Sequence, residues 1–269
     1  MTVFQALVLG VLQGLAEFLP ISSSAHLALA PWAFGWPEPG LAVDVALHVG
    51  TLAAVLVYFR DEWLRLIGAA MEIVRTQRIQ TVEQRRVIYL IVATIPGGLA
   101  GVALNDYAES TFRSPLLIGS ALAAMGILLW LVDLVRPANR PLDAIRWSDA
   151  IWIGIAQAFA ILPGVSRSGA TITAGRALAL DRESAATFSF LMSMPIIAAA
   201  AVFKVPHLLH SGGAGAPLLV GVLASAVSGW LAIEIVMRYV RTHSYGAFAA
   251  YRVVLGAAAV TLFWMRARG

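Results

Sequence analysis

Apolar residues dominate long stretches of the chain, and six of these stretches are long enough to cross a bilayer. A spanning helix needs about 20 mostly apolar residues. The segments that meet this requirement are residues 42–60, 86–104, 115–135, 186–203, 216–238 and 248–265. This pattern predicts an all-α polytopic membrane protein with about six transmembrane helices.

Two further apolar stretches, residues 3–34 and 149–180, are interrupted in their middle by polar residues. The interruptions read LPISSSAH at 19–26 and LPGVSRSG at 162–169. Non-helical backbone at membrane depth is tolerated only where protein or a water-filled cavity satisfies its polar groups. We therefore expect each stretch to form a re-entrant helix hairpin rather than a simple span.

Arginines gather in some of the connecting segments and predict the orientation of the chain. They are frequent in the loop from Arg60 to Arg86, in the loop 136–147 and after the fifth span, so the positive-inside rule makes these segments cytoplasmic. The loops near 105–114 and 204–215 then lie outside, and six crossings place both termini on the external side. Two arginines at the C-terminus count mildly against this orientation.

The predicted orientation makes the two hairpins enter from opposite sides. The residues around the two breaks are also alike, GVLQGLAEFLPISSS at 10–24 and GIAQAFAILPGVSRS at 154–168, and three spans follow each hairpin. Similar halves of opposite orientation form an inverted repeat, whose broken helices meet near the middle of the bilayer. We expect one integral membrane domain over 1–269, with pseudo-repeats at about 1–135 and 149–265.

Composition narrows the class of protein. The chain is 59% hydrophobic and 13% charged, whereas a soluble domain is roughly a quarter charged. This nearly excludes a water-soluble enzyme, a disordered chain and a nucleic-acid-binding module, so we expect no nucleic-acid partner. The chain has no cysteine, which removes disulfides and thiolate chemistry. No basic residue precedes the apolar N-terminal stretch, so we expect no cleaved signal peptide.

The first break carries several groups that are costly inside a membrane. Gln13 and Glu17 are four residues apart and share one helix face. A carboxylate at the centre of a membrane helix costs about 2.5–3.5 kcal/mol on insertion scales, so Glu17 should face a cavity. The hydroxyls of Ser22, Ser23 and Ser24 could cap the second half-helix. Alternatively, a serine could act as nucleophile with His26 as its base.

The second break supplies the opposite charge. Arg167 stands between Ser166 and Ser168, and Thr171 follows one turn later. Backbone N–H groups at a helix N-terminus bind anions, and the planar fork of arginine suits phosphate oxygens. A simpler interpretation is that Arg167 only neutralises Glu17.

Together the two breaks offer the groups needed to cleave a phosphate ester or anhydride. A glutamate also suggests a divalent cation, because Mg²⁺ takes one or two carboxylates and completes its shell with phosphates and water. His48 is interpreted as structural or interfacial. Whether Arg176 and Arg252 assist an anion stays undecided.

The motifs QGLAEFLPISSSAH and PGVSRSGATIT resemble those of the bacitracin-resistance family of undecaprenyl-pyrophosphate phosphatases, and the resemblance covers essentially the whole chain. It implies a multi-pass hydrolase of the bacterial inner membrane. Such an enzyme converts undecaprenyl diphosphate into undecaprenyl phosphate and inorganic phosphate, recycles the lipid carrier for peptidoglycan synthesis and confers bacitracin resistance.

The resemblance also implies roles for individual residues. Glu17 would bind the metal, Mg²⁺ or Ca²⁺, and the pyrophosphate; Ser23 would be the nucleophile, His26 the proton carrier and Arg167 the phosphate-binding arginine. The remaining expected substrate contacts are Gln13, Ser22, Ser24, Ser166, Ser168 and Thr171. Two departures stand out: position 13 is Gln where many relatives have Glu, and SSSAH replaces SSTGH. His26 as nucleophile, with Ser23 as a phosphate contact, stays open.

The expected partners are a polyprenyl diphosphate lipid, whose tail leaves sideways into the bilayer, and the bilayer itself. We expect the active site to open to the external face, and a homodimer is compatible with the sequence. A transporter or flippase of polyprenyl phosphate lipids remains the alternative, because inverted repeats with broken helices also suit alternating access.

Overall fold

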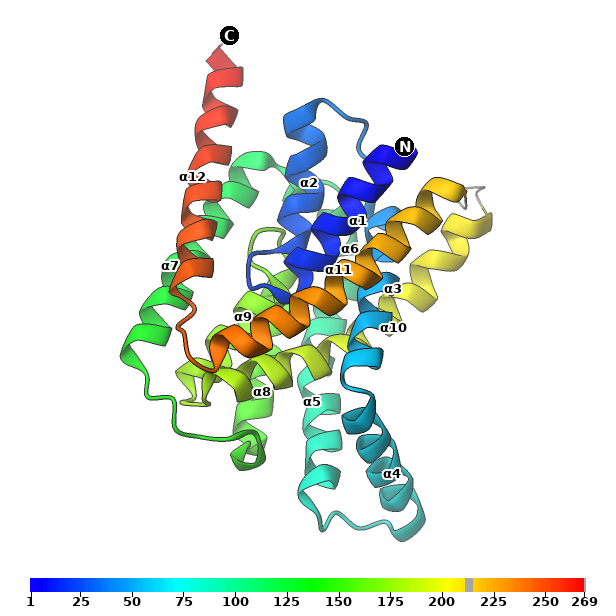
Figure 1. Cartoon of the computed structure of the whole chain (residues 1–269), viewed down its shortest axis with the longest axis vertical. Coiled ribbons are helices and arrows are strands. Elements are labelled where there is room, and N and C mark those ends of the chain that lie inside the picture. The colour runs from blue at the N-terminus through cyan, green and yellow to red at the C-terminus, as the bar shows by residue number, and fades with distance from the viewer. Residues whose placement is uncertain (211–214, 269) are drawn as a thin grey trace.

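The computed structural model describes residues 1–210 and 215–268 and folds most of them into helices (Figure 1). Six of these helices are long and apolar enough to cross a membrane. They are α3 (Leu41–Tyr58), α5 (Val82–Ala103), α7 (Pro115–Val135), α10 (Arg182–His210), α11 (Ala216–Val240) and α12 (Gly246–Arg268). Each contains one of the predicted spans, or all but one or two residues of it, so the all-α membrane class and the six spans are confirmed.

The outer faces of these helices are apolar. Large side chains such as Val102, Val135 and Val254 are mostly exposed. Soluble monomers rarely expose contiguous apolar patches of more than a few hundred Å². A surface of this kind is what a lipid environment requires.

Both interrupted stretches form pairs of shorter helices, as the sequence predicts. The first pair is α1 (Val3–Phe18) and α2 (Ser23–Phe34). The second is α8 (Trp147–Ala158), extended by the 3₁₀ turn η3 (Phe159–Ile161), and α9 (Arg167–Ala177). The two breaks lie near the middle of the molecule (Figure 1).

The helix packing agrees with a repeat. Helix α1 packs along α11, the second long helix after the other break, and α8 packs along α5, the second long helix after the first break. At Gly10 the contact between α1 and α11 is so close that an added Cβ would lie 2.2 Å from the carbonyl oxygen of Gly221. Small residues allow this approach between membrane helices. The depth of the hairpins in a bilayer and their inverted orientation stay predictions.

The segment expected as a cytoplasmic loop from Arg60 to Arg86 is mostly helical, which corrects the sequence interpretation. It contains α4 (Arg60–Thr76) and the start of α5. Apolar residues recur along α4 at the spacing of one helix face: Leu64, Ile67, Met71 and Val74. The expected external loop at 204–215 begins within α10, and residues 211–214 lie outside the described residues.

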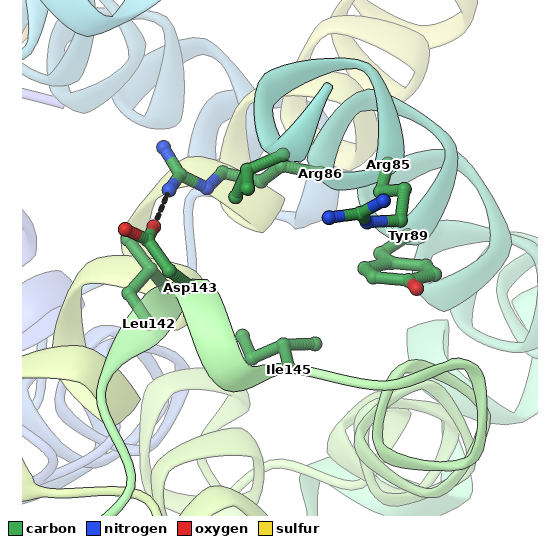
Figure 2. Close-up of a pocket in the computed structure, with 7 residues that line it drawn as sticks. Arg85, Arg86, Tyr89, Leu142, Asp143 and Ile145 are labelled. Atoms are coloured by element: carbon green, nitrogen blue, oxygen red, sulfur yellow. Dashed lines mark hydrogen bonds and ion pairs between the residues drawn. The ribbon is translucent and has the colours of Figure 1, made fainter. Parts of the chain in front are cut away.

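The other connections are short: α6 (Asn105–Glu109) and the 3₁₀ turns η1 (Thr111–Arg113) and η2 (Leu142–Ala144). A cleft of about 10 Å³ lies between α5 and η2 (Figure 2), which is room for about one water molecule. On its edge Arg86 pairs with Asp143, and it also pairs with Glu62 of α4. The ion pairs of Arg86 therefore connect α4, α5 and η2, and the cleft is too small for a substrate.

Candidate active site

The two helix breaks end in the same local conformation. Ser22 has a φ of 76° and Ser166 a φ of 71°, so both lie in the left-handed region. Each serine is the N-cap of the helix that follows: Ser22 Oγ accepts from the N–H of Ala25 at 3.4 Å, and Ser166 Oγ accepts from the N–H of Gly169 at 3.0 Å. The capping interpretation is therefore confirmed for Ser22, and Ser166 has the same role at the second break, which the sequence analysis does not predict.

Ser24 and Ser168 occupy matching positions two residues after the caps. Each hydroxyl lies 3.3 Å from the hydroxyl of its cap serine. The structure thus brings these four expected substrate contacts into two equivalent turns, where their hydroxyls support the start of a helix.

The two turns contact each other directly. The N–H of Gly164 donates to Ser22 Oγ at 3.2 Å. Arg252, which is fully buried, donates to the carbonyl of Pro20 at 3.0 Å and to the carbonyls of Gly164 and Val165 at 2.8 Å. Broken helices leave carbonyls without an intrahelical partner, and Arg252 satisfies them at both breaks. Arg252 therefore has a structural role, a point that the sequence alone leaves undecided.

Arg176, the other undecided arginine, is also structural. It is fully buried and its Nε donates to Asp133 at 2.7 Å. Its remaining donors bind backbone carbonyls, including that of Pro137 at 3.0 Å. These four hydrogen bonds hold the guanidinium group within the fold.

Glu17 lies where the two halves of the chain meet. Its Oε1 accepts from Arg167 at 2.6 Å, and its Oε2 accepts from Ser23 Oγ at 2.6 Å and from Gln13 Nε2 at 3.1 Å. His48 Nε2 lies 3.2 Å from the same Oε2. The structure therefore brings four of the predicted site residues together, and both Glu17 and Ser23 are buried.

Arg167 is held in place from its other side. It donates to the carbonyl of Ser189 in α10 at 2.8 Å. Thr171 Oγ1 donates to the carbonyl of Arg167 at 2.8 Å and lies 2.7 Å from Ser189 Oγ. Thr171 therefore positions the arginine through the backbone. Ser189 was missed because a serine within a span ordinarily bonds its own helix, and nothing in its neighbourhood marks it.

His26 does not hydrogen-bond Ser23 in this structure. Its Nδ1 lies 2.7 Å from the carbonyl of Ser22 and its Nε2 lies 2.7 Å from the hydroxyl of Tyr251. The rings of His26 and Tyr251 stack with centroids 5.7 Å apart. A carbonyl can only accept, so Nδ1 carries the proton and Nε2 accepts from Tyr251. No sequence signal pointed to Tyr251.

Sequence reasoning interprets His48 as structural or interfacial, but in the structure it lies beside Glu17. Its Nδ1 lies 2.7 Å from the carbonyl of Asp44, one turn earlier in α3. An ionisable residue within a span is itself a reason to suspect function. The position of His48 within a span is therefore a sequence signal for function, and its proximity to Glu17 is consistent with that signal.

The donor set around Glu17 fits a divalent cation. Gln13 is fully buried and its Oε1 has no hydrogen-bond partner. This amide oxygen and the Glu17 carboxylate are the hard oxygen ligands that Mg²⁺ and Ca²⁺ prefer. The described part of the chain contains no group of three or more His, Asp or Glu side chains that could hold a metal ion by themselves. A cation would therefore need substrate oxygens and water to complete its shell.

An apolar groove of about 620 Å³ lies beside the site, between α7, α8 and α9. On α9 it is lined by Ala170, Ala174 and Ala177. These residues follow Arg167 at intervals that keep them on one helix face. The walls of the groove include the largely exposed Trp152 and Phe159.

Fold and site together define a polytopic helical membrane protein in which two broken helices bring a carboxylate–arginine pair to a serine hydroxyl. Residues 6–258 match the family described as bacitracin resistance protein BacA, and the chain belongs to this family.

Curated relatives match over nearly their full length. A protein of Gemmatimonas aurantiaca is 59% identical over 95% of this chain and 96% of its own. One of Moorella thermoacetica is 51% identical over 99% and 100%, and one of Pelotomaculum thermopropionicum is 50% identical over 97% of each. All three bear the name undecaprenyl-diphosphatase.

Proposed function

We propose that the protein is a membrane phosphatase that hydrolyses undecaprenyl diphosphate to undecaprenyl phosphate and inorganic phosphate. The observation that carries this function is the Ser23 hydroxyl bonded to Glu17 at 2.6 Å, with Arg167 on the other oxygen of the same carboxylate. The names of the relatives support it over a transporter. The reaction returns the lipid carrier to peptidoglycan synthesis, and surplus activity removes the target of bacitracin.

Ser23 Oγ is the nucleophile and attacks the terminal phosphorus. A P–O bond forms, the bridging P–O bond breaks, and undecaprenyl phosphate leaves. Arg167 and the N–H groups at the start of α9 stabilise the charge on the phosphoryl oxygens. Water then attacks the phosphoserine, releases phosphate and restores the Ser23 hydroxyl.

His26 is the proton acceptor predicted for Ser23. It lies three residues after Ser23 on α2, so both side chains share a helix face. Its Nε2 carries the lone pair, which the Tyr251 hydroxyl occupies in the free enzyme. The Ser23 proton is directed at Glu17 in this state, and transfer to His26 requires the imidazole to leave Tyr251.

Glu17 and the free Oε1 of Gln13 would hold Mg²⁺ or Ca²⁺. The cation would neutralise part of the charge of the diphosphate and so favour attack by an uncharged hydroxyl. The carbonyl of Gln13 is uncharged, so the protein would supply only one negative charge to the cation. The diphosphate would supply the remaining negative charge and would therefore be a necessary part of the metal site.

The groove between α7, α8 and α9 is the path proposed for the polyprenyl tail. It begins one turn after Arg167 on α9, and its lining is almost wholly apolar, as a polyprenyl tail requires. We place the enzyme in the bacterial inner membrane with its site open to the external face, where the first hairpin is predicted to enter. A homodimer is compatible with this arrangement.

Purified protein in detergent should release phosphate from undecaprenyl diphosphate, and EDTA should lower the rate. Ser23→Ala and Arg167→Ala should lose the activity, whereas the exposed controls Ser244→Ala and Arg78→Ala should keep it. Absence of phosphate release from wild-type protein that still moves the lipid between leaflets of a vesicle would support the transporter instead.

The nucleophile is identified by trapping the phosphorylated enzyme. Phosphoserine survives acid and phosphohistidine does not. An acid-stable adduct that maps to Ser23 supports the proposed mechanism, and an acid-labile adduct at His26 supports the alternative.

A further inference from the structure

Two histidines of the site, His26 and His48, make the same hydrogen bond at Nδ1 but face different groups at Nε2. In both, Nδ1 lies 2.7 Å from the carbonyl of the residue four positions earlier: Ser22 for His26 and Asp44 for His48. Because a carbonyl only accepts, each ring carries its proton on Nδ1 and presents a lone pair at Nε2. For His26 that lone pair meets a donor, the hydroxyl of Tyr251.

For His48 the lone pair meets an acceptor. Its Nε2 lies 3.2 Å from Glu17 Oε2, an oxygen of the carboxylate that forms an ion pair with Arg167. Two hydrogen-bond acceptors at this distance repel each other unless a positively charged atom lies between them. Such a contact requires either a proton or a metal ion.

Three observations favour a metal ion. The Nδ1–H of His48 bonded to a backbone carbonyl is the arrangement that orients metal-binding histidines. Gln13 Oε1, an oxygen without a partner, belongs to an amide that contacts the same Glu17 oxygen. The Glu17 charge is already balanced by Arg167, so an extra proton on His48 would not be needed for neutrality, whereas a bound diphosphate brings the charge that a cation requires.

We propose that His48 is a nitrogen ligand of the divalent cation, next to Glu17, with Gln13 Oε1 as a further oxygen ligand. The inference deepens the proposed phosphatase function and rests on it for the origin of the diphosphate. Helices α1 and α3 would each supply part of the site. An imidazole ligand favours transition-metal ions over Ca²⁺, so Mn²⁺ should bind more tightly than Ca²⁺.

Mn²⁺ is the probe, with protein purified without an oligohistidine tag. Pulsed electron paramagnetic resonance of the Mn²⁺-loaded protein should show hyperfine coupling to a histidine nitrogen. His48→Gln should abolish this coupling while its amide oxygen preserves some binding, and His48→Ala should weaken Mn²⁺ binding by at least about tenfold. His26→Gln, at the histidine whose Nε2 already has a donor, should leave the coupling unchanged.

Coupling that persists in His48→Gln, or Mn²⁺ binding that lacks any nitrogen coupling in the wild type, would overturn the assignment and make His48 a protonated partner of Glu17. The thermal stability of each variant, measured in detergent, shows whether it has folded. Phosphate release by the wild type is measured separately from Mn²⁺ binding. If the wild type shows the Mn²⁺ coupling but releases no phosphate, the phosphatase function is contradicted and the ligand assignment is not. If it releases phosphate but binds no Mn²⁺, the ligand assignment is contradicted and the function is not.

Discussion

Glu17 and Arg167 carry opposite charges into an apolar region, and both are nearly buried, with 5% and 13% of their side chains exposed. Removing two charges from water costs several kcal/mol per ion, and a pair that does nothing else can often be replaced by apolar residues without loss. This pair also contacts Ser23 and the start of α9. Its position is explained by the phosphate chemistry, since a bound diphosphate can take the Arg167 donors that Glu17 now accepts.

Replacement of Arg167 by lysine tests this use of the guanidinium. Lysine keeps the charge but has no planar fork, so it cannot bond a phosphate oxygen and the Ser189 carbonyl together. Loss of one charge-assisted hydrogen bond, worth about 1.5–3 kcal/mol, should lower kcat/KM for phosphate release roughly 10- to 150-fold. Arg78→Lys on the exposed surface is the matched control. Wild-type activity in Arg167→Lys would show that charge alone is sufficient.

Glu17 and Arg167 are predicted from the sequence, whereas His48, Ser189 and Tyr251 are missed, and of these three only His48 carried a signal, as an ionisable residue within a span. Glu17 and Arg167 could be found because a charge at a helix break within an apolar stretch is costly. Ser189 and Tyr251 belong to ordinary spans, and they reach the site only because α10 and α12 pack against the broken helices. Such contacts depend on which helices are neighbours, and the pattern of one chain does not contain that information.

At the scale of elements, each break needs a backbone that continues a helix only after a sharp turn. Gly164 has a φ of +98°, and an added Cβ would lie 2.5 Å from the carbonyl oxygen of Ile118 in α7. The second turn is therefore fitted against α7 as well as against Ser22. The first turn has no glycine, and Ser22 itself adopts the positive φ that its hydrogen bond from Gly164 supports.

Gly164→Ala should destabilise the protein and abolish activity. A positive φ alone costs an alanine about 1–2 kcal/mol, and the overlap with the Ile118 carbonyl must move either α7 or the turn that carries Arg167. Gly35→Ala is the control, since Gly35 has a φ of +66° and open space around its Cβ position. Thermal unfolding in detergent and phosphate release are the measurements. Equal effects of the two substitutions would mean that the turn tolerates displacement.

At the scale of the whole molecule, the six spans follow directly from length and composition, because a bilayer sets both. The breaks could also be located, since their polar residues interrupt otherwise apolar stretches. The arginines of residues 60–86 predict a cytoplasmic loop, because basic residues mark the cytoplasmic side, whereas the apolar residues of the same segment recur at helical spacing. The groove beside α9 could not be foreseen, because α7, α8 and α9 together form its walls.

The groove makes the length of the lipid tail a testable variable. Ala177→Phe would place a ring at the far end of the groove, ten residues after Arg167 and on the same helix face. The substitution should reduce the preference for undecaprenyl over farnesyl diphosphate by at least about tenfold, because a long tail loses more apolar burial than a short one. The rate with farnesyl diphosphate should change little, since its short tail leaves the far end of the groove empty. Ala258→Phe, on the exposed face of α12, is the control. An equal loss with both substrates would place the tail elsewhere and leave the groove to bilayer lipid.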